Sequence, residues 1–263
     1  MQTLIRTAIL SAAIRSAAIL SAAILSAAIF SGNVSAASSC RSESTALKPR
    51  PLTELYTSEG CSSCPPADRW LSGKRASIER GDFSAIAWHV DYWDQLGWKD
   101  PFSIPAAAPR QRMLASQSGS NVYTPGVFLN GREWRRWSSG TMPETPQHTA
   151  PALVLNVKRL DDKLHARIEV SALTEKSTLV LVTQLLNRDS QVKRGENSGK
   201  VLHHDFSASE VQQTSLAANS ATQTTTADLT LPTGSSAITA FIENARGQVL
   251  QSTQIFLDGC ALE

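Results

Sequence analysis

The feature that most constrains this chain is the pair Cys61-Ser-Ser-Cys64, which is followed at once by two prolines. Residues 51–57 before the pair alternate in polarity as a short strand does, and residues 67–74 after it have the apolar spacing of a helix. Proline is well tolerated in the first turn of a helix, because the N–H group that it lacks would have no intrahelical partner there. The sequence therefore predicts two close cysteines at the point where a strand turns into a helix.

This placement favours chemistry at the sulfur atoms. The unpaired N–H groups and the partial positive charge at a helix N-terminus stabilise a thiolate and lower the pKa of a thiol there. We expect Cys61 to be the exposed attacking sulfur and Cys64 to resolve the mixed disulfide that results. Two other interpretations stay open, namely a static structural disulfide and half of a metal site to which His89 contributes.

The chain opens with a segment, residues 1–36, that we expect to be absent from the mature protein. Arg6 and Arg15 are its only charges, the middle of the segment is apolar, and Val34-Ser35-Ala36 provides small residues for a cleavage. These features predict a secretory signal peptide and hence a periplasmic or secreted protein. An uncleaved membrane anchor and lipidation of Cys40 are the alternatives.

Charge argues against two classes of partner. The full chain has 25 basic and 23 acidic residues, and removal of residues 1–36 takes away two arginines and no acid. The mature chain is therefore formally neutral, with 23 residues of each sign. Since nucleic-acid binding needs a basic patch or field, we expect no nucleic-acid partner. We also expect no stable membrane insertion once the signal peptide is removed.

A second motif occupies residues 122–131. Its Thr124-Pro125 step precedes an apolar strand, and Asn130-Gly131 is a strong signal for a hairpin turn. A proline at the start of a strand is what a cis-prolyl loop requires, and an ordinary trans proline on an edge strand is the alternative.

Three motifs in this order resemble those of a known family. They are Glu54-Leu-Tyr-Thr-Ser-Glu-Gly-Cys-Ser-Ser-Cys-Pro-Pro-Ala-Asp68, His89-Val-Asp-Tyr-Trp-Asp-Gln-Leu-Gly-Trp-Lys-Asp-Pro101 and Tyr123-Thr-Pro125. In them the chain resembles the bacterial secreted family of the domain of unknown function 1223 type, within the thioredoxin-like superfamily. The resemblance covers most of the mature chain and is strongest over residues 52–131.

The resemblance implies an α/β thioredoxin-like domain over residues 51–150, after an N-terminal tail at residues 37–50. It implies that Cys61 and Cys64 form the redox pair and that Pro125, next to Thr124, is a cis-proline that faces them. The family label itself supplies no substrate.

Glu54 is a further candidate for the site. It lies on the predicted strand, seven residues before Cys61. A buried carboxylate at this place would relay the proton of Cys64 when the mixed disulfide is released. A solvated strand glutamate is the alternative.

Residues 91–117 form a long insertion that is rich in aromatic residues and proline and ends in a short helix. Trp93 and Trp98 either pack in the interior or form the wall of a substrate groove. Arg110 and Arg112 are interpreted as part of a solvated helix face.

Residues 151–260 have the pattern of an all-β domain. The segment 163–170 alternates strictly between apolar and polar side chains, as a half-buried strand does. Six similar runs lie at residues 152–157, 178–186, 202–206, 224–231, 237–243 and 248–257. Seven short strands at this spacing predict an antiparallel sandwich-like domain after the α/β domain. The turn-rich loop at residues 194–199 could lie near the redox site.

Cys40 and Cys260 lie at the two ends of the mature chain. Two otherwise unpaired thiols in an exported protein predict a structural disulfide that ties the N-terminal tail to the last strand.

The sequence thus favours an exported thiol–disulfide oxidoreductase-like protein that acts on protein or small thiol substrates through Cys61 and Cys64. We expect a protein thiol or disulfide as its partner, and no cofactor. The alternatives are a Cu(I)-binding module and a non-catalytic binding protein in which the close pair is a structural disulfide.

Overall fold

The computed structural model of the chain describes residues 40–139, 142 and 150–260. The predicted signal peptide, residues 1–36, lies outside the described residues. Within the described ranges there are three α-helices, none of which is long and apolar enough to cross a membrane. The helices are α1 (Pro65–Ser72), α2 (Arg75–Glu79) and α3 (Ala107–Ser118), with short 3-10 turns at Asp94–Leu96, Trp137–Ser139 and Leu257–Gly259.

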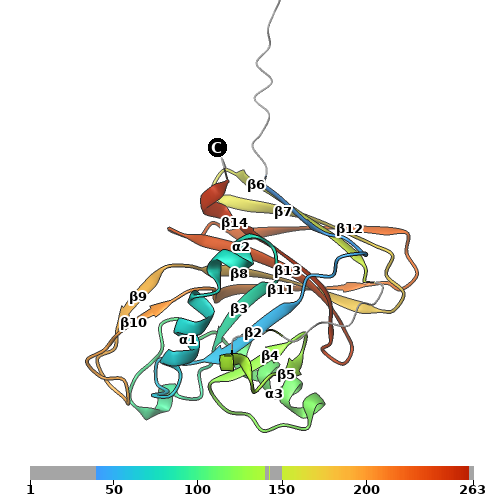
Figure 1. Cartoon of the computed structure of the whole chain (residues 1–263). Helices are drawn as coiled ribbons and strands as arrows, with labels where there is room; N and C mark the ends of the chain where they lie inside the picture. Colours follow the sequence, from blue (N-terminus) through green and yellow to red (C-terminus); the bar gives the residue numbers. More distant parts are fainter. Residues whose placement is uncertain (1–39, 140–141, 143–149, 261–263) are drawn as a thin grey trace, which may run out of the picture. The chain divides into compact units, whose positions relative to one another are not determined.

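Strands are the predominant secondary structure in the described part of the chain (Figure 1). They are β1 (Cys40–Ser44), β2 (Leu52–Thr57), β3 (Ser84–His89), β4 (Gly126–Leu129), β5 (Arg132–Glu133), β6 (Ala152–Leu160), β7 (Lys163–Ser171), β8 (Ser177–Leu185), β9 (Arg188–Gln191), β10 (Val201–His204), β11 (Ser207–Leu216), β12 (Thr222–Thr230), β13 (Ser236–Asn244) and β14 (Val249–Phe256). In the described part of the chain they form a sheet ordered β14-β13-β8-β11-β3-β2-β4-β5, a sheet ordered β1-β6-β7-β12 and a separate β9-β10 hairpin.

The predicted fold class, an α/β thioredoxin-like domain followed by an all-β sandwich, is wrong. One large mixed sheet runs through both halves of the chain, with β2 parallel to β3 and β3 parallel to β11. The contact between β3 and β11, which joins the two halves of the sheet, is short. Ser207 lies opposite Ala87, and the N–H group of Ala87 donates to the carbonyl oxygen of Phe206 at 2.8 Å. The sheet therefore crosses the boundary predicted at residues 150 and 151.

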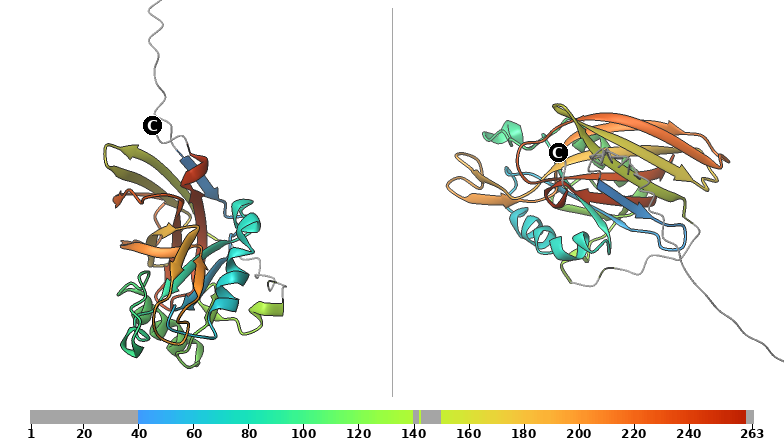
Figure 2. Two further views of the ribbon diagram at one scale, coloured as in Figure 1. Left: turned by 90° about the vertical axis from the view of Figure 1, so that its left-hand side faces the viewer. Right: turned by 90° about the horizontal axis from the view of Figure 1, so that it is seen from above.

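The apolar side chains form three layers of core. The four-stranded sheet packs on β8, β13 and β14 through side chains such as Leu155 and Ile238, and the two other views separate these layers (Figure 2). On the β2–β3 part of the large sheet, α1 and α2 cover the face that carries Leu55. Helix α3 covers the opposite face, where Tyr56 and Trp88 are buried. Successive side chains of β2 therefore point into different layers, so that one set lies next to α1 and the other set lies next to α3.

The alternating patterns explain these layers. The predicted alternation over residues 163–170 is present in β7, where Leu164, Ile168 and Val170 are buried. Strand β8 lies inside the large sheet, so both of its faces are covered, and neighbouring residues such as Leu181 and Val182 point into different cores.

Glutamine side chains complete the join between the two halves. The Gln184 amide donates to the carbonyl oxygen of Ala85 at 2.6 Å, and the Gln254 side chain accepts from the N–H group of Ala85 at 3.0 Å. A buried backbone group without a partner would be costly, so these amides replace ladder hydrogen bonds that β3 lacks at this point.

Both predicted pairings of the four cysteines are confirmed. Cys40 at the start of β1 is bonded to Cys260, with the two Cα atoms 5.7 Å apart. Cys61 is bonded to Cys64. The predicted hairpin is also present, and Asn130 and Gly131 at its turn have φ angles of 50° and 78°, which suit this residue pair.

Candidate functional site

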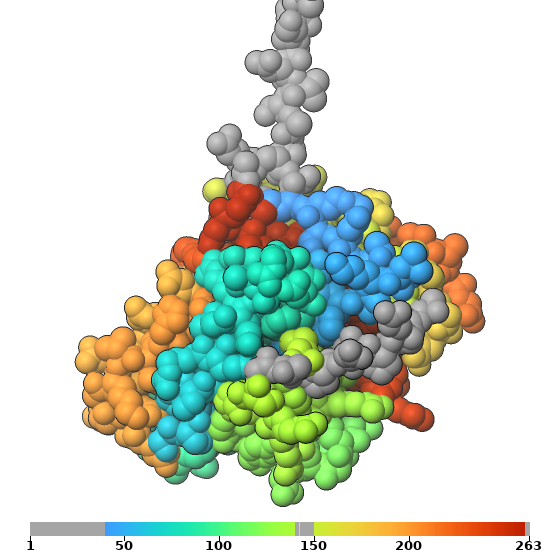
Figure 3. Space-filling view, in the orientation of Figure 1, coloured from blue at the N-terminus to red at the C-terminus, as the bar shows by residue number. Residues whose placement is uncertain are grey.

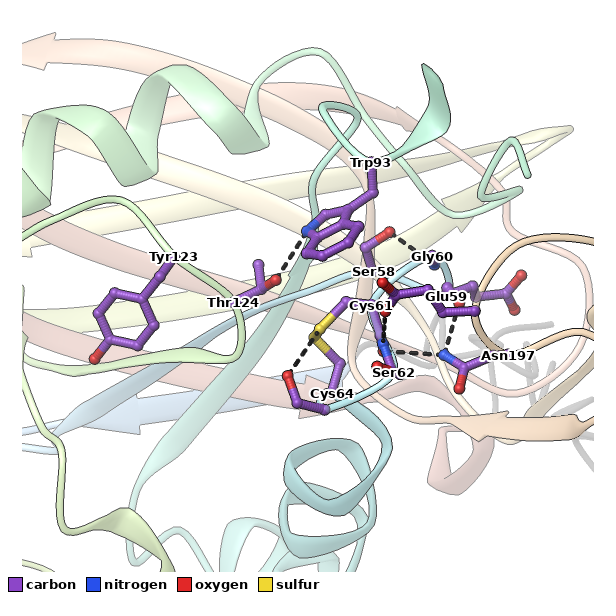
Figure 4. The surroundings of a disulfide bond; sticks show 12 residues. Ser58, Glu59, Gly60, Cys61, Ser62, Cys64, Trp93, Tyr123, Thr124 and Asn197 are labelled. Atoms are coloured by element: carbon purple, nitrogen blue, oxygen red, sulfur yellow. Dashed lines mark hydrogen bonds between the residues drawn. A yellow bond between two sulfur atoms is a disulfide. The ribbon is translucent and has the colours of Figure 1, made fainter. Parts of the chain in front are cut away.

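The Cys61–Cys64 disulfide lies where β2 passes into α1, as predicted (Figure 4). The N–H group of Cys61 donates to the carbonyl oxygen of Ser58 at 3.1 Å, which closes the turn after the strand. Cys64 has helical angles and caps α1, and its carbonyl oxygen accepts from the N–H group of Ala67 at 2.8 Å. Pro65 occupies the first helical position, where its missing N–H group costs nothing.

Trp93 packs beside the disulfide, and the prediction that Cys61 is exposed is wrong. Only 1% of Cys61 and none of Cys64 is exposed. The absence of a side chain at Gly60 lets Trp93 approach, because a Cβ atom there would lie 2.9 Å from the Cβ atom of Trp93. The indole N–H group of Trp93 donates to the hydroxyl of Thr124 at 2.9 Å (Figure 4). The Cys61 sulfur is thus closed to a partner in this structure, and the half-buried Trp93 lies beside it.

Thr124 and Pro125 lie on the loop before β4. The peptide bond between them is cis, which confirms the cis-prolyl interpretation. The loop is held from α3, where the Gln111 side chain donates to the carbonyl oxygen of Tyr123 at 2.6 Å. Among the predicted site residues, the structure therefore brings Cys61, Cys64 and the Thr124–Pro125 step to one place.

Glu54 lies elsewhere. It is fully buried on the face of β2 that α3 covers, whereas α1 covers the other face. Arg110 binds its carboxylate with two nitrogen atoms, at 2.5 and 3.0 Å, and the indole of Trp88 donates to it at 2.8 Å. A carboxylate engaged in this way on the far face of the strand is poorly placed to relay a proton to Cys64.

Arg110 joins two buried carboxylates. The expectation that it lies on a solvated helix face is wrong, because only 9% of the residue is exposed, whereas Arg112 is exposed as expected. The guanidinium group of Arg110 also donates to the carboxylate of Glu243 in β13, at 2.9 Å. Burial raises the pKa of Glu243, although the charge of Arg110 opposes that rise. The α3 arginine thus ties the two halves of the chain together.

A buried polar cluster lies around the turn that precedes Cys61. The carboxylate of Glu59 accepts from the indole of Trp98 at 2.6 Å and is 3.0 Å from a ring nitrogen of His204. The Glu59 N–H group donates to Asp100 at 2.9 Å, and Asp100 is 2.8 Å from the ring of His89. Burial works against a charged His89, but the Asp100 carboxylate outweighs it and raises the pKa of the imidazole.

The cluster does not favour metal binding. Both ring nitrogens of His89 have partners, since the second is 3.2 Å from the hydroxyl of Ser207. No group of three or more histidine, cysteine, aspartate or glutamate side chains in the described ranges is arranged to hold a metal ion. Both ring nitrogens of His89 are therefore engaged within this cluster.

Asp68 is a site residue that the sequence reasoning missed. It lies in α1 four residues after Cys64, so the two side chains share one face of the helix. The residue is 8% exposed, and burial raises the pKa of its carboxyl group, a rise that His204 and His89 limit. The spacing from Cys64 was the signal that could have identified it.

His204 has an unused polar atom next to this region. Its Nε2 atom faces Glu59, while its Nδ1 atom is buried and has no hydrogen-bond partner among the described residues. The ring therefore has one buried nitrogen without a hydrogen bond in the part of the chain that the structure describes.

The turn-rich loop between β9 and β10 reaches the same turn. Asn197 donates to the carbonyl oxygens of Glu59 and Cys61, and Glu196 accepts from the N–H group of Ser62. This places the loop beside the disulfide, as the sequence suggested.

Comparisons with known proteins assign no activity to this arrangement. A family model described as a protein of unknown function (DUF1223) matches residues 52–242. A crystal structure of an Agrobacterium tumefaciens protein from a structural genomics programme is similar to the chain, with 26% sequence identity and a TM-score of 0.54. The match covers 78% of this chain and 93% of the other. No curated protein matches the chain significantly.

Proposed function

This chain belongs to the DUF1223 family of proteins of unknown function, and we propose that it is an exported thiol–disulfide oxidoreductase. Its Cys61–Cys64 pair exchanges electrons with thiols or disulfides of a protein or small-molecule partner. The observation that carries the proposal is the closed Cys-Ser-Ser-Cys disulfide at the start of α1, with Asp68 one helical turn behind Cys64.

A structural role accounts poorly for this disulfide. The stabilisation that a cross-link supplies grows with the length of chain that it closes. Cys61 and Cys64 are separated by 3 positions, and for so short a loop the chain-entropy relation gives about 2 kcal/mol. Cys40 and Cys260 are separated by 220 positions, for which the same relation gives about 5 kcal/mol. The Cys40–Cys260 disulfide therefore contributes more to stability than the Cys61–Cys64 disulfide does, and this difference favours a chemical role for Cys61 and Cys64.

The reaction moves two electrons and two protons. A partner thiolate attacks the sulfur of Cys61, a mixed disulfide forms, and the Cys61–Cys64 bond breaks with its electron pair on Cys64. The Cys64 thiolate takes up a proton. A second partner thiolate then attacks the partner sulfur of the mixed disulfide, which releases oxidised partner and the thiolate of Cys61, which takes up the second proton. Run in reverse, the same steps reduce a partner disulfide.

Asp68 supplies the proton for Cys64 in this scheme. Because the two side chains lie on one helix face and burial raises the pKa of Asp68, the carboxyl group keeps its proton to a higher pH than an exposed aspartate does.

The compartment that we propose is the periplasm or the exterior of the cell. The predicted signal peptide supports it, and so does the long-range Cys40–Cys260 disulfide, because such bonds persist in oxidising compartments.

An equilibrium titration in glutathione buffers tests the proposed function. The fraction of disulfide between Cys61 and Cys64 is measured by acid quenching, alkylation and peptide mass mapping. We expect a reversible transition with a potential above about −300 mV, because structural disulfides of exported proteins fall below that value. A pair that stays fully oxidised, like the Cys40–Cys260 bond, would make it structural and overturn the proposal.

Replacing Asp68 with asparagine should slow reduction of the pair most strongly at low pH. The carboxyl group can give its proton to the leaving Cys64 sulfur below its raised pKa, whereas asparagine has no such proton. General acid catalysis supplies about 100-fold, so we expect a loss of this order below the pKa of Asp68. The ratio of wild-type to D68N rates should fall towards one as the pH rises through that pKa.

The rates are measured with dithiothreitol from pH 4 to pH 9, and taking the ratio cancels the ionisation of the reductant. The variant D162N, at an exposed position in the turn between β6 and β7, is the matched control and should match the wild type at every pH. A D68N ratio that stays constant across this range would exclude Asp68 as the proton donor.

A further inference from the structure

The loop that connects β9 and β10, residues 192–200, is contributed by the second half of the chain. Its backbone is closed by hydrogen bonds from Val192 to Lys200 at 3.0 Å and from Gly199 to Val192 at 2.8 Å. The hairpin that carries it is separate from the two larger sheets. In the space-filling view this hairpin, in orange, lies against the cyan surface of α1 (Figure 3).

Asn197 anchors the loop to the turn before Cys61. It is fully buried, and its amide nitrogen donates to the carbonyl oxygens of Glu59 at 2.8 Å and Cys61 at 2.9 Å (Figure 4). Its own amide oxygen accepts from the ammonium group of Lys200 at 2.8 Å, which fixes the orientation of the amide. The backbone around Cys61 is thus held by a residue 136 positions further along the chain.

Glu196 brings a charge to the same turn. Its carboxylate accepts from the N–H group of Ser62, the residue after Cys61, at 2.9 Å. Hydrogen bonds from Ser62 lower the pKa of Glu196, so its carboxyl group is ionised at neutral pH. The turn that leads into α1 therefore has a negative charge close to the N–H groups that would otherwise stabilise a Cys61 thiolate.

We propose that Glu196, held in place by Asn197, biases the Cys61–Cys64 pair towards its disulfide form. The inference rests on the proposed redox function and adds a means by which the β-rich half sets the potential of the pair. A negative charge beside Cys61 repels the thiolate and occupies a donor, so it destabilises the reduced pair. A charge that only supported the helix would act on the oxidised and reduced forms alike.

The test compares the wild type with E196Q and E196K in glutathione buffers. Glutamine keeps an acceptor for the Ser62 N–H group and removes the charge, and lysine reverses the charge. Because Glu196 is solvent-exposed, screening limits the effect, and we expect E196Q to favour the reduced pair about threefold. This corresponds to a potential higher by about 14 mV. E196K should shift it further in the same direction, and E175Q, exposed in the β7–β8 turn, should not shift it.

A second measurement keeps this inference separate from the redox function. In a C64S background, the pH profile of alkylation of Cys61 by iodoacetamide reports its thiol pKa without any exchange reaction. We expect E196Q to lower that pKa by about half a unit, the same threefold effect. An unchanged pKa in E196Q overturns the inference even if the pair titrates in glutathione. A lowered pKa in a protein whose pair fails to titrate overturns the redox function and leaves the charge effect standing.

Discussion

Replacing Arg110 with methionine should lower the free energy of unfolding by about 3–5 kcal/mol at neutral pH. The arginine forms two hydrogen bonds to Glu54 and one to Glu243, and both carboxylates are buried. Methionine preserves much of the side-chain volume, so the loss reflects two buried carboxyl groups without a counter-charge rather than a cavity.

The loss of unfolding free energy in R110M should become larger as the pH rises. Arg110 opposes the rise that burial causes in the pKa of Glu243, so without Arg110 this carboxyl group is expected to bind its proton more tightly in the folded protein than in the unfolded one. A raised carboxyl pKa makes the folded state less stable as the pH rises towards it. The destabilisation in R110M should therefore be smaller near pH 4.5 than at pH 7.

Urea unfolding at the two pH values provides the measurement. R112M is the matched control, because Arg112 lies on the same helix and is exposed, and its substitution should change stability by no more than about 0.5 kcal/mol. If R110M were as stable as R112M, the Glu54–Arg110–Glu243 group would not hold the two halves together.

The variants Cys64→Ser and Cys61→Ser should behave in opposite ways towards oxidised glutathione. In C64S the remaining thiol of Cys61 attacks the disulfide, and the mixed disulfide accumulates because the resolving thiol is missing. In C61S the remaining thiol is Cys64, the N-cap of α1, and exposure does not separate the two sulfurs, because 1% of Cys61 and none of Cys64 is exposed. We expect the Cys64 thiol to react about 10-fold more slowly, since the N–H groups ahead of the helix lower the pKa of Cys61 and give it the larger thiolate fraction.

Intact mass measured over time after addition of oxidised glutathione follows both variants. Equal rates for C61S and C64S would contradict the assignment of Cys61 as the attacking sulfur. They would not by themselves exclude exchange, which the wild-type titration decides.

Local patterns predicted the parts of the fold that local physics determines. The strand before the cysteines, the helix after them and the hairpin turn at Asn130-Gly131 each depend on a few neighbouring residues, and each is present. The pairing of Cys40 with Cys260 followed from the count of cysteines once Cys61 and Cys64 were paired.

The large sheet could not be predicted in this way, because β11 carries almost no apolar signal. Its sequence Ser207-Ala-Ser-Glu-Val-Gln-Gln-Thr-Ser-Leu216 is mostly polar, and residues 209–215 are exposed or partly exposed. The strand exists because β8 supplies its hydrogen-bond partners along nearly its whole length, and its first residue then pairs with β3. Missing β11 meant missing the join, and so the fold class was wrong.

The site shows the same division. The positions of Cys61 and Cys64 follow from local sequence, whereas Trp93, which packs beside the disulfide, lies 32 residues further along the chain than Cys61. Glu54 was assigned to the pair because it lies on the strand that leads into the turn, seven residues before Cys61, yet alternation along β2 turns its side chain to the opposite face. Asn197 carries no local sign of its role, because its partners are backbone carbonyl oxygens.

Stoichiometric transfer to a dithiol peptide tests the central claim most directly. The oxidised protein is mixed with an equal amount of a reduced synthetic peptide that contains two cysteines, and both are mapped by mass after acid quenching. The account predicts that peptide disulfide forms in step with loss of the Cys61–Cys64 bond, one for one, while Cys40–Cys260 stays intact. A peptide that stays reduced, or that is oxidised equally fast by C61S, would contradict it.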